Sequence, residues 1–123
     1  MRVGLFGSKD WKSYSDFVRA MTVFIQEAAE LGHDNVVFVH TDSIGAERMI
    51  IEYVDKTKKF LRHNNFKIKD ESVGRNIQVV KDMSIIESGI DYALIFSTGC
   101  KRTYSCQKLL KEYNIPYKLV ESA

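Results

Sequence analysis

The chain has 123 residues, which is enough for one compact domain and too few for two ordinary ones. Hydrophobic residues make up 45% of the chain, so a sizeable core can form and the composition argues against disorder. A total of 18 Lys and Arg against 16 Asp and Glu gives a formal net charge of +2, which is too balanced to indicate nucleic-acid binding from bulk charge alone.

Targeting and redox signals are weak. The opening residues carry Arg2 and are interrupted by Gly4 and Gly7, unlike the apolar region of a signal peptide. No apolar run has the length of a membrane span. Cys100 and Cys106 form neither a metal-ligand pair nor a redox CxxC motif. We therefore expect reduced thiols in a cytoplasmic protein.

Taken in chain order, the hydrophobic periodicity predicts strands that alternate with helices. An apolar strand over residues 1–6 is followed by an amphipathic helix from Tyr14 to about Leu31, which Gly32 ends. Further strands are predicted over residues 35–40, 66–69 (a half-exposed edge strand), 91–96 and 115–120. Further helices are predicted over residues 45 to about 60, 75–86 and 105–113.

This alternation predicts the fold class, because parallel strands need helical crossovers that cover both faces of a sheet. We predict a single Rossmann-like α/β domain over residues 1–123, with a mainly parallel sheet of about five strands flanked by helices on both faces. Ligands of such sheets bind beyond the carboxyl ends of the strands.

Three segments that follow predicted strands combine small residues and hydroxyl groups at the start of a helix, as oxyanion binding requires. They are residues 7–11, 40–47 and 97–103. Gly7 lets the backbone approach a ligand closely, while Ser8 adds a hydroxyl group and Lys9 a positive charge. The third segment brings the cations of Lys101 and Arg102. Together the three segments predict an anionic ligand.

Four landmarks follow one another in a familiar order: Gly7–Trp11, then Phe38–His40 with Gly45–Glu47, then Arg75–Asn76, then Phe96–Thr103. This series resembles the SLOG superfamily, the Rossmann-like group that includes DprA and the LOG cytokinin-activating proteins. Within that group the chain is most similar to the small YpsA-related type, a domain of unknown function found in bacteria and phages. The resemblance covers nearly the whole chain and implies a nucleotide or nucleotide-derived ligand, a homodimer, and a phage-encoded or nucleotide-signalling setting.

The chain also departs from the family pattern. Thr41 and Asp42 replace a double glycine, and Arg102 stands where a glycine would precede Thr103. The stretch of residues 104–107 lacks the glutamate that LOG-type phosphoribohydrolases carry. Because cleavage of an N-glycosidic bond needs an acid or a nucleophile near the anomeric carbon, this absence argues against an enzyme of the LOG kind. Glu47 is the general acid or base that an enzyme would have to use.

The candidate ligand-binding residues are Gly7, Ser8, Lys9, Asp10, Trp11, His40, Gly45, Glu47, Arg75, Asn76, Gly99, Arg102 and Thr103. Residues 7–9 would hold phosphate, and Glu47 would contact ribose. The anionic end would be closed by Arg75, Gly99, Arg102 and Thr103.

Several of these residues have structural alternatives that the sequence leaves open. Trp11 could pack or stack on a base, and His40 could hydrogen-bond at the edge of the core. Asp10 could cap a helix or accept a ribose hydroxyl. Glu47 could serve as favourable charge in a first helical turn. Arg75 could form a surface ion pair, and Asn76 could cap a helix.

We predict that the protein senses or sequesters a nucleotide-like molecule and uses no cofactor. We expect no metal site, since His33 and His63 stand alone in polar turns. One alternative is an N-glycosidic hydrolase. Another is a DprA-like nucleic-acid binder that uses a basic cluster, although a solvated helix end explains this cluster better: Lys56, Lys58, Lys59, Arg62 and His63, with Lys67 and Lys69 beyond it. The last is a protein-interaction module with a decayed pocket.

Overall fold

The computed structural model describes residues 1–8, 10–41, 45–61, 66–73, 78–99 and 101–121, with side chains for all of these except residues 58–61, 78–81 and 102. The described residues form five strands and four helices in strict alternation. The strands are β1 (Arg2–Gly7), β2 (Asn35–His40), β3 (Lys67–Ser72), β4 (Tyr92–Ser97) and β5 (Tyr117–Glu121). The helices are α1 (Tyr14–Glu30), α2 (Ala46–Leu61), α3 (Gln78–Glu87) and α4 (Lys101–Glu112).

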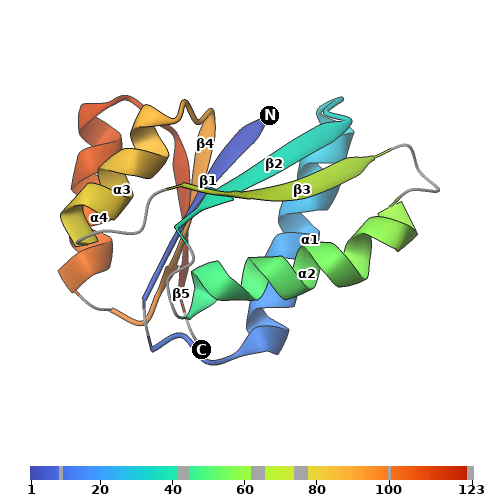
Figure 1. Ribbon diagram of the computed structural model, residues 1–123, viewed down its shortest axis with the longest axis horizontal. Helices are drawn as coiled ribbons and strands as arrows, with labels where there is room; N and C mark the ends of the chain where they lie inside the picture. Colours follow the sequence, from blue (N-terminus) through green and yellow to red (C-terminus); the bar gives the residue numbers. More distant parts are fainter. Residues whose placement is uncertain (9, 42–44, 62–65, 74–77, 100, 122–123) are drawn as a thin grey trace.

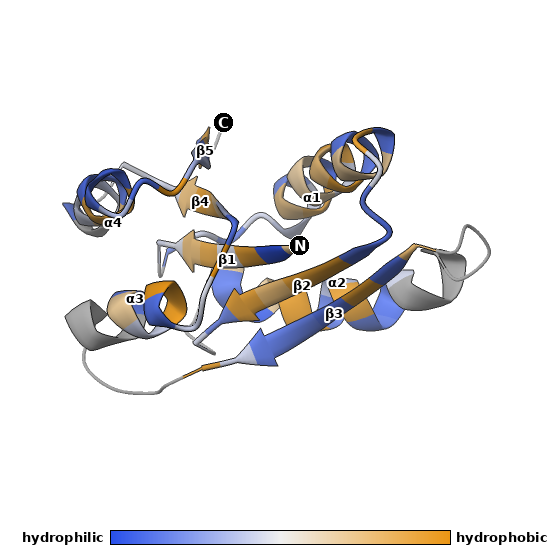
Figure 2. Ribbon diagram, turned by 90° about the horizontal axis from the view of Figure 1, so that it is seen from above, coloured by the Kyte–Doolittle hydropathy of each residue, from blue (hydrophilic) through white to orange (hydrophobic). Residues whose placement is uncertain are grey.

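The five strands form one sheet in the order β3-β2-β1-β4-β5, and every neighbouring pair is parallel. The central strands β1, β2 and β4 are buried over nearly their whole length, as strands covered on both faces should be. Figure 2 shows these strands as mainly hydrophobic and the edge strand β3 as mainly hydrophilic. The predicted α/β class with a parallel sheet is confirmed.

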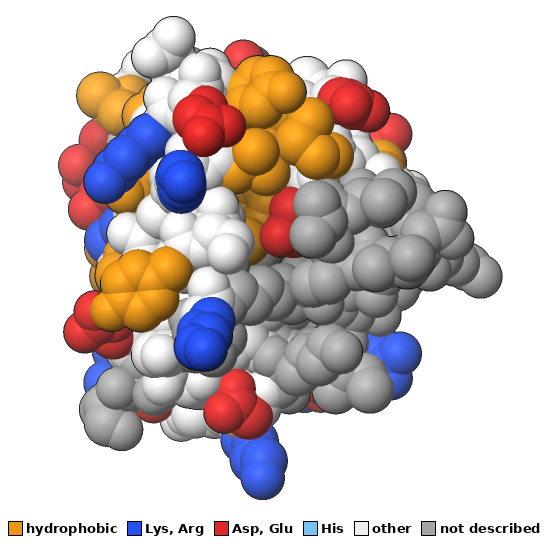
Figure 3. Space-filling model, turned by 90° about the vertical axis from the view of Figure 1, so that its left-hand side faces the viewer, with side chains coloured by type: hydrophobic (Ala, Val, Ile, Leu, Met, Phe, Trp, Pro, Cys, Tyr) orange, Lys and Arg blue, Asp and Glu red, His pale blue; other side chains and the backbone are white. Residues whose placement is uncertain are grey.

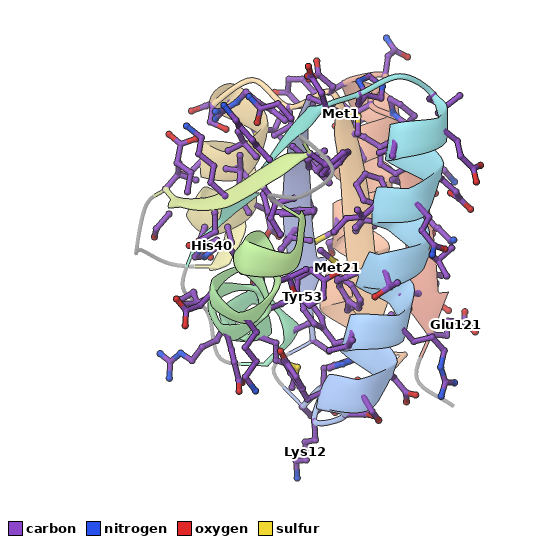
Figure 4. The ribbon with its side chains drawn as sticks, turned by 90° about the vertical axis from the view of Figure 1, so that its right-hand side faces the viewer. Met1, Lys12, Met21, His40, Tyr53 and Glu121 are labelled. Carbon is purple, nitrogen blue, oxygen red and sulfur yellow. The ribbon has the colours of Figure 1, made fainter. Side chains whose placement is uncertain are left out.

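The helices cover the sheet in pairs, α1 and α2 on one face and α3 and α4 on the other (Figure 1). The first core packs Phe17 and Met21 of α1 and Ile50 of α2 against alternate residues of the central strands. Figure 4 shows Met21 and Tyr53 inside this layer. The intervening strand residues face the second core, where α3 and α4 contribute Ile85 and Leu110 among others. Coverage of both faces is therefore as predicted.

Helix α1 begins with a different cap from the one the sequence suggested. Ser13 is the N-cap residue, and its hydroxyl oxygen accepts a hydrogen bond from the backbone N–H of Asp16 at 3.2 Å. The alternative interpretation of Asp10 as a helix cap is therefore wrong, because the chain needs three further residues to turn from β1 into the helix. At its other end α1 stops before Gly32, which has a φ of +89° as its stop role requires.

The last helix begins earlier than the sequence predicted. Helix α4 starts at Lys101 rather than at Ser105, because its buried stripe of Thr103, Cys106 and Leu110 extends one turn further toward the N-terminus. Thr103 therefore lies in the first turn of a helix and not in a loop. The thiol of Cys106 donates a hydrogen bond to the buried carboxylate of Asp82 at 3.2 Å.

Strand β3 is an edge strand, as predicted, but it continues to Ser72 because it pairs with the whole of β2, from Asn35 opposite Lys67 to His40 opposite Ser72. The predicted start of the third helix, residues 75–77, lies outside the described residues. In the part of the chain that the structure describes, no helix combines the length and apolar character that crossing a bilayer needs.

Candidate functional site

The carboxyl end of β1 is the natural place for a ligand site. From this central strand the chain passes first to β2 on one side and later to β4 on the other, so the strand order reverses between β1 and β4. Ligands of open parallel sheets bind at such a reversal. Figure 4 shows Met1 at the opposite end of the molecule from Lys12, which extends outward from the segment that follows β1.

Hydrogen bonds join the segments that follow β1 and β4. The buried Ser8 donates its backbone N–H to the carbonyl oxygen of Phe96 at 2.9 Å. The Ser8 hydroxyl oxygen accepts a hydrogen bond from the backbone N–H of Thr98 at 3.1 Å. The Thr98 hydroxyl in turn donates to the Asp10 carboxylate at 2.7 Å. The two segments therefore form one connected rim.

Gly7 brings the start of α2 against the same rim. A Cβ atom on Gly7 would lie 2.8 Å from the Cβ atom of Ala46, the first residue of α2. Real Cβ atoms do not approach so closely, so this position requires a glycine. The segments that follow β1, β2 and β4 thus meet around residues 7 and 8, which is the convergence that the sequence predicts.

Two glycines in the left-handed region lead into the helices at this rim. Gly45 has a φ of +97° and comes directly before α2, while Gly99 has a φ of +89° and comes shortly before α4. The first backbone N–H groups of an α-helix have no intrahelical acceptor and carry partial positive charge. Two helix N-termini at one edge of the sheet make it favourable for negative charge.

The turn between β4 and α4 is braced from within. The Ser97 hydroxyl oxygen accepts a hydrogen bond from the backbone N–H of Gly99 at 2.9 Å and lies 2.9 Å from the Thr103 hydroxyl oxygen. Both hydroxyl-bearing side chains are buried. In this arrangement Thr103 holds the turn in shape, so its predicted contact with the anionic end of a ligand would be indirect.

His40 and Glu47 are both buried within the protein at the end of β2. The His40 ring nitrogen Nε2 lies 2.9 Å from the Asp70 carboxylate on β3, which confirms hydrogen bonding at the core edge. The Glu47 carboxylate accepts hydrogen bonds from the backbone N–H and the hydroxyl of Thr41, at 3.3 and 3.2 Å. Glu47 occupies the first turn of α2 and is only 1% exposed. A ribose contact would require its carboxylate to leave Thr41.

Trp11 packs into the core rather than facing the rim. It is 2% exposed, and its ring meets that of Phe96 edge to face at a centroid distance of 5.3 Å. Its indole N–H donates to the carbonyl oxygen of Ser13 at 3.1 Å. The packing interpretation is confirmed, and the residue anchors the segment after β1 to the layer beneath α1.

The rim thus contains groups that face solvent as well as groups that brace it. Asp10, Lys12, Gly99 and Lys101 are exposed, and Thr98 is partly so. Lys9, Arg75 and Asn76 lie outside the described residues, as does the side chain of Arg102, so their predicted roles stay predictions. Two surface hollows formed by described residues lie elsewhere, one beside α2 and one beside α1 and β5, so the topology and contacts of the rim are what mark the candidate site.

The list of candidate residues omits three residues of the site. Ser97 and Thr98 belong to the predicted segment 97–103, and they could have been named because their two hydroxyl groups directly follow the clearest buried strand. Asp70, the partner of His40, could not have been found without the register between β2 and β3.

The basic cluster at the end of α2 is partly neutralised. The Lys56 ammonium group lies 2.7 Å from the Glu52 carboxylate, a hydrogen bond that raises the pKa of Lys56. It also lies 5.4 Å from the centroid of the Tyr14 ring. The side chains of Lys58, Lys59, Arg62 and His63 lie outside the described residues.

Among the described side chains, no group of three or more His, Cys, Asp or Glu residues is arranged to hold a metal ion. No protein-family model, curated protein or solved structure matches the chain.

Proposed function

We propose that the protein binds a nucleotide or nucleotide-derived ligand at the carboxyl edge of its sheet, and so senses or sequesters that molecule. The observation that supports this most strongly is the double contact of residues 7 and 8. Gly7 lies against Ala46 at the start of α2, and Ser8 is hydrogen-bonded to Thr98 before α4. One short segment thereby gathers two helix N-termini at the reversal of the strand order.

The phosphate groups of the ligand would lie over these helix N-termini, where partial positive charge and nearby cations favour them. The exposed Lys12 and Lys101 are available at this rim. Lys9 and Arg102 are expected to add to them on the strength of their positions in the sequence.

The ribose would be recognised by Asp10 in preference to Glu47. The Asp10 carboxylate is exposed at the rim, whereas the Glu47 carboxylate is buried against Thr41. A carboxylate that accepts hydrogen bonds from ribose hydroxyl groups is a common feature of nucleotide sites in this class of fold. The resemblance to the SLOG superfamily supports the same ligand class and implies a homodimer, which light scattering on the purified protein would test.

Mass spectrometry of small molecules released from the purified native protein tests this proposal. A co-purifying nucleotide, followed by a rise in melting temperature when it is added back, is the expected result. A ligand at a hundred times its Kd stabilises a protein by about 2.7 kcal/mol. Nucleosides and inorganic phosphate serve as controls, each expected to stabilise less than the complete nucleotide. If none of the common nucleotides shifts the melting temperature, the decayed-pocket alternative is favoured.

Hydrolysis of an N-glycosidic bond is the alternative function. The buried position of Glu47 weighs against it, because a general acid must reach the leaving group. Incubation with nucleoside monophosphates should therefore release no free base. Turnover that is abolished by Glu47→Gln would overturn the binding proposal in favour of the enzyme.

A further inference from the structure

Helix α4 carries a basic stripe that also contains an exposed aromatic ring. Lys101, Tyr104, Lys108 and Lys111 are spaced by three, four and three residues, so they lie along one face of the helix. We call these four residues the α4 stripe. All four are exposed, and Tyr104 is 69% exposed. Figure 3, which shows the side of the molecule that carries α3 and α4, displays several Lys or Arg side chains on this face, with Asp or Glu side chains among them.

The orientation of the stripe is fixed by the opposite face of α4. Thr103, Cys106 and Leu110 are buried on that face, and the last two belong to the second core. A helix rises about 1.5 Å per residue, so the stripe extends roughly 15 Å from Lys101 to Lys111. The lysines therefore form a line on a rigid support rather than a cluster on a loop.

The lysines of the stripe are not held in ion pairs by described acidic residues, and the nearest acid on the helix, Glu112, follows Lys108 by four residues. Within the part of the chain that the structure describes, no ion pair involves Lys101, Lys108 or Lys111. The first acidic residue of α4 is Glu112, at its end. Lys56, by contrast, is paired with Glu52. On β3, Lys69 is followed directly by the acidic residues Asp70 and Glu71.

We propose that the α4 stripe binds a single-stranded nucleic acid, with the lysines contacting phosphates and the Tyr104 ring stacking on a base. Stacking needs an unpaired base, which a duplex does not offer. A lipid surface fits less well, because membrane-binding helices present several large apolar residues. Among the described side chains of α4, Tyr104 is the only large hydrophobic one that is exposed. Lys101 is shared with the proposed nucleotide site, but Tyr104, Lys108 and Lys111 are not, so this inference stands without that site.

Fluorescence anisotropy with a short labelled single strand of mixed sequence tests the inference, over a series of salt concentrations. Three phosphate contacts predict a slope of about −2 for log K against log salt on a single strand. The double variant Lys108→Glu, Lys111→Glu should weaken binding at least tenfold and flatten this slope. Tyr104→Ala should weaken binding about fivefold or more, whereas Tyr104→Phe should retain it.

The matched control is Lys67→Glu, Lys69→Glu, which makes the same charge change on two exposed lysines of the edge strand β3. The affinity of this control variant for the single strand should stay within about twofold of the wild-type affinity, even though the interaction is dominated by charge. All variants should retain the circular dichroism spectrum of the wild type, and the α4 double variant should retain any nucleotide-induced rise in melting temperature. The inference is overturned if the single strand does not bind, if the β3 variant loses as much affinity as the α4 variant, or if only anionic vesicles bind.

Discussion

Ser8 and Thr98 are separated by ninety positions in the chain, yet the hydroxyl oxygen of Ser8 accepts the backbone N–H of Thr98 at 3.1 Å. This bond crosses from the end of β1 to the end of β4, the neighbouring strands between which the sheet order reverses. It makes the rim of the candidate site a single hydrogen-bonded unit. The shape of the site therefore depends on groups that are buried and do not themselves face a ligand.

Replacing Ser8 by Ala tests this bracing. Ser8 is fully buried, so the variant leaves the N–H of Thr98 without its acceptor. The expected loss in unfolding free energy is about 1–3 kcal/mol, measured by urea denaturation. Ser15→Ala is the control, because Ser15 is exposed on α1 and its change should stay within about 0.5 kcal/mol. Equal stability of the two variants would show that the Ser8–Thr98 bond does not brace the rim.

Replacing Gly7 by Ala tests the contact between β1 and α2. The new Cβ atom would meet the Cβ atom of Ala46 at 2.8 Å, and neither atom can rotate away. Overpacking of this kind costs about 1–3 kcal/mol, and the start of α2 should move from the rim. Nucleotide affinity should therefore fall together with the melting temperature.

Gly4→Ala provides the comparison for that variant. Its Cβ atom would also be crowded, at 2.7 Å from the Cδ1 atom of Ile90 and 2.8 Å from the Cγ2 atom of Ile85, but in the second core and away from the rim. It should lower the melting temperature while the folded protein keeps its nucleotide affinity. If both variants lose nucleotide affinity, the loss cannot be attributed to the Gly7–Ala46 contact.

Glu47 should matter for stability through its oxygen atoms rather than through its charge. Glu47→Ala removes the acceptor for both the N–H and the hydroxyl of Thr41, which predicts a loss of about 1–3 kcal/mol in urea unfolding. Glu47→Gln retains one side-chain oxygen and should lose less. If Gln is as damaging as Ala, the carboxylate charge itself is required for stability, which contradicts this account.

Alkaline pH should destabilise the fold through Tyr53. Burial raises the pKa of the Tyr53 phenol, against hydrogen bonds from Thr22 and Thr57 that lower it. The unfolded chain releases the phenolic proton of Tyr53 at about pH 10, while the folded chain holds it to higher pH. The contribution is therefore complete below pH 10 and is lost as the pH rises through the folded pKa.

Urea unfolding at about pH 9 and about pH 11 measures this effect. Tyr53→Phe should reduce the loss of stability between the two values, and only in part, because burial also raises the pKa of Tyr14 and Tyr92. Tyr113→Phe, at a residue that is 50% exposed, should leave the loss unchanged. A profile that is the same for both variants would contradict the assignment to Tyr53.

The strand and helix order could be predicted because this chain has strong periodicity. The run at residues 92–96 is apolar throughout and bounded by Asp91 and Ser97, and α1 repeats its apolar residues at helical spacing. The beginning of α4 could not be predicted in the same way. Among the described side chains of its first turn, Thr103 is the inward one, and it is polar and buried against Ser97.

The convergence of the three rim segments could also be predicted, since parallel strands place their carboxyl ends together. The contacts that hold them could not. The Thr98–Asp10 bond and the His40–Asp70 pair join residues that are remote in sequence. Burial of Glu47 likewise depends on Thr41, which the sequence showed only as a departure from the resembled motif.

Two glycines give the most direct test of the nucleotide site. Gly99 and Gly89 have φ values of +89° and +86°, and a Cβ atom on either would meet nothing within 4 Å. Alanine at either position should thus cost a similar amount, about 1–2 kcal/mol. Gly99 lies at the rim, beyond the carboxyl end of β4, whereas Gly89 comes before the amino end of the same strand.

The decisive measurement is isothermal titration calorimetry of a nucleotide into the wild type, Gly89→Ala and Gly99→Ala. We predict that the wild type and Gly89→Ala bind with the same Kd and that Gly99→Ala binds at least tenfold more weakly. No heat of binding with any nucleotide, or an equal Kd in all three proteins, would contradict a nucleotide site at this edge of the sheet.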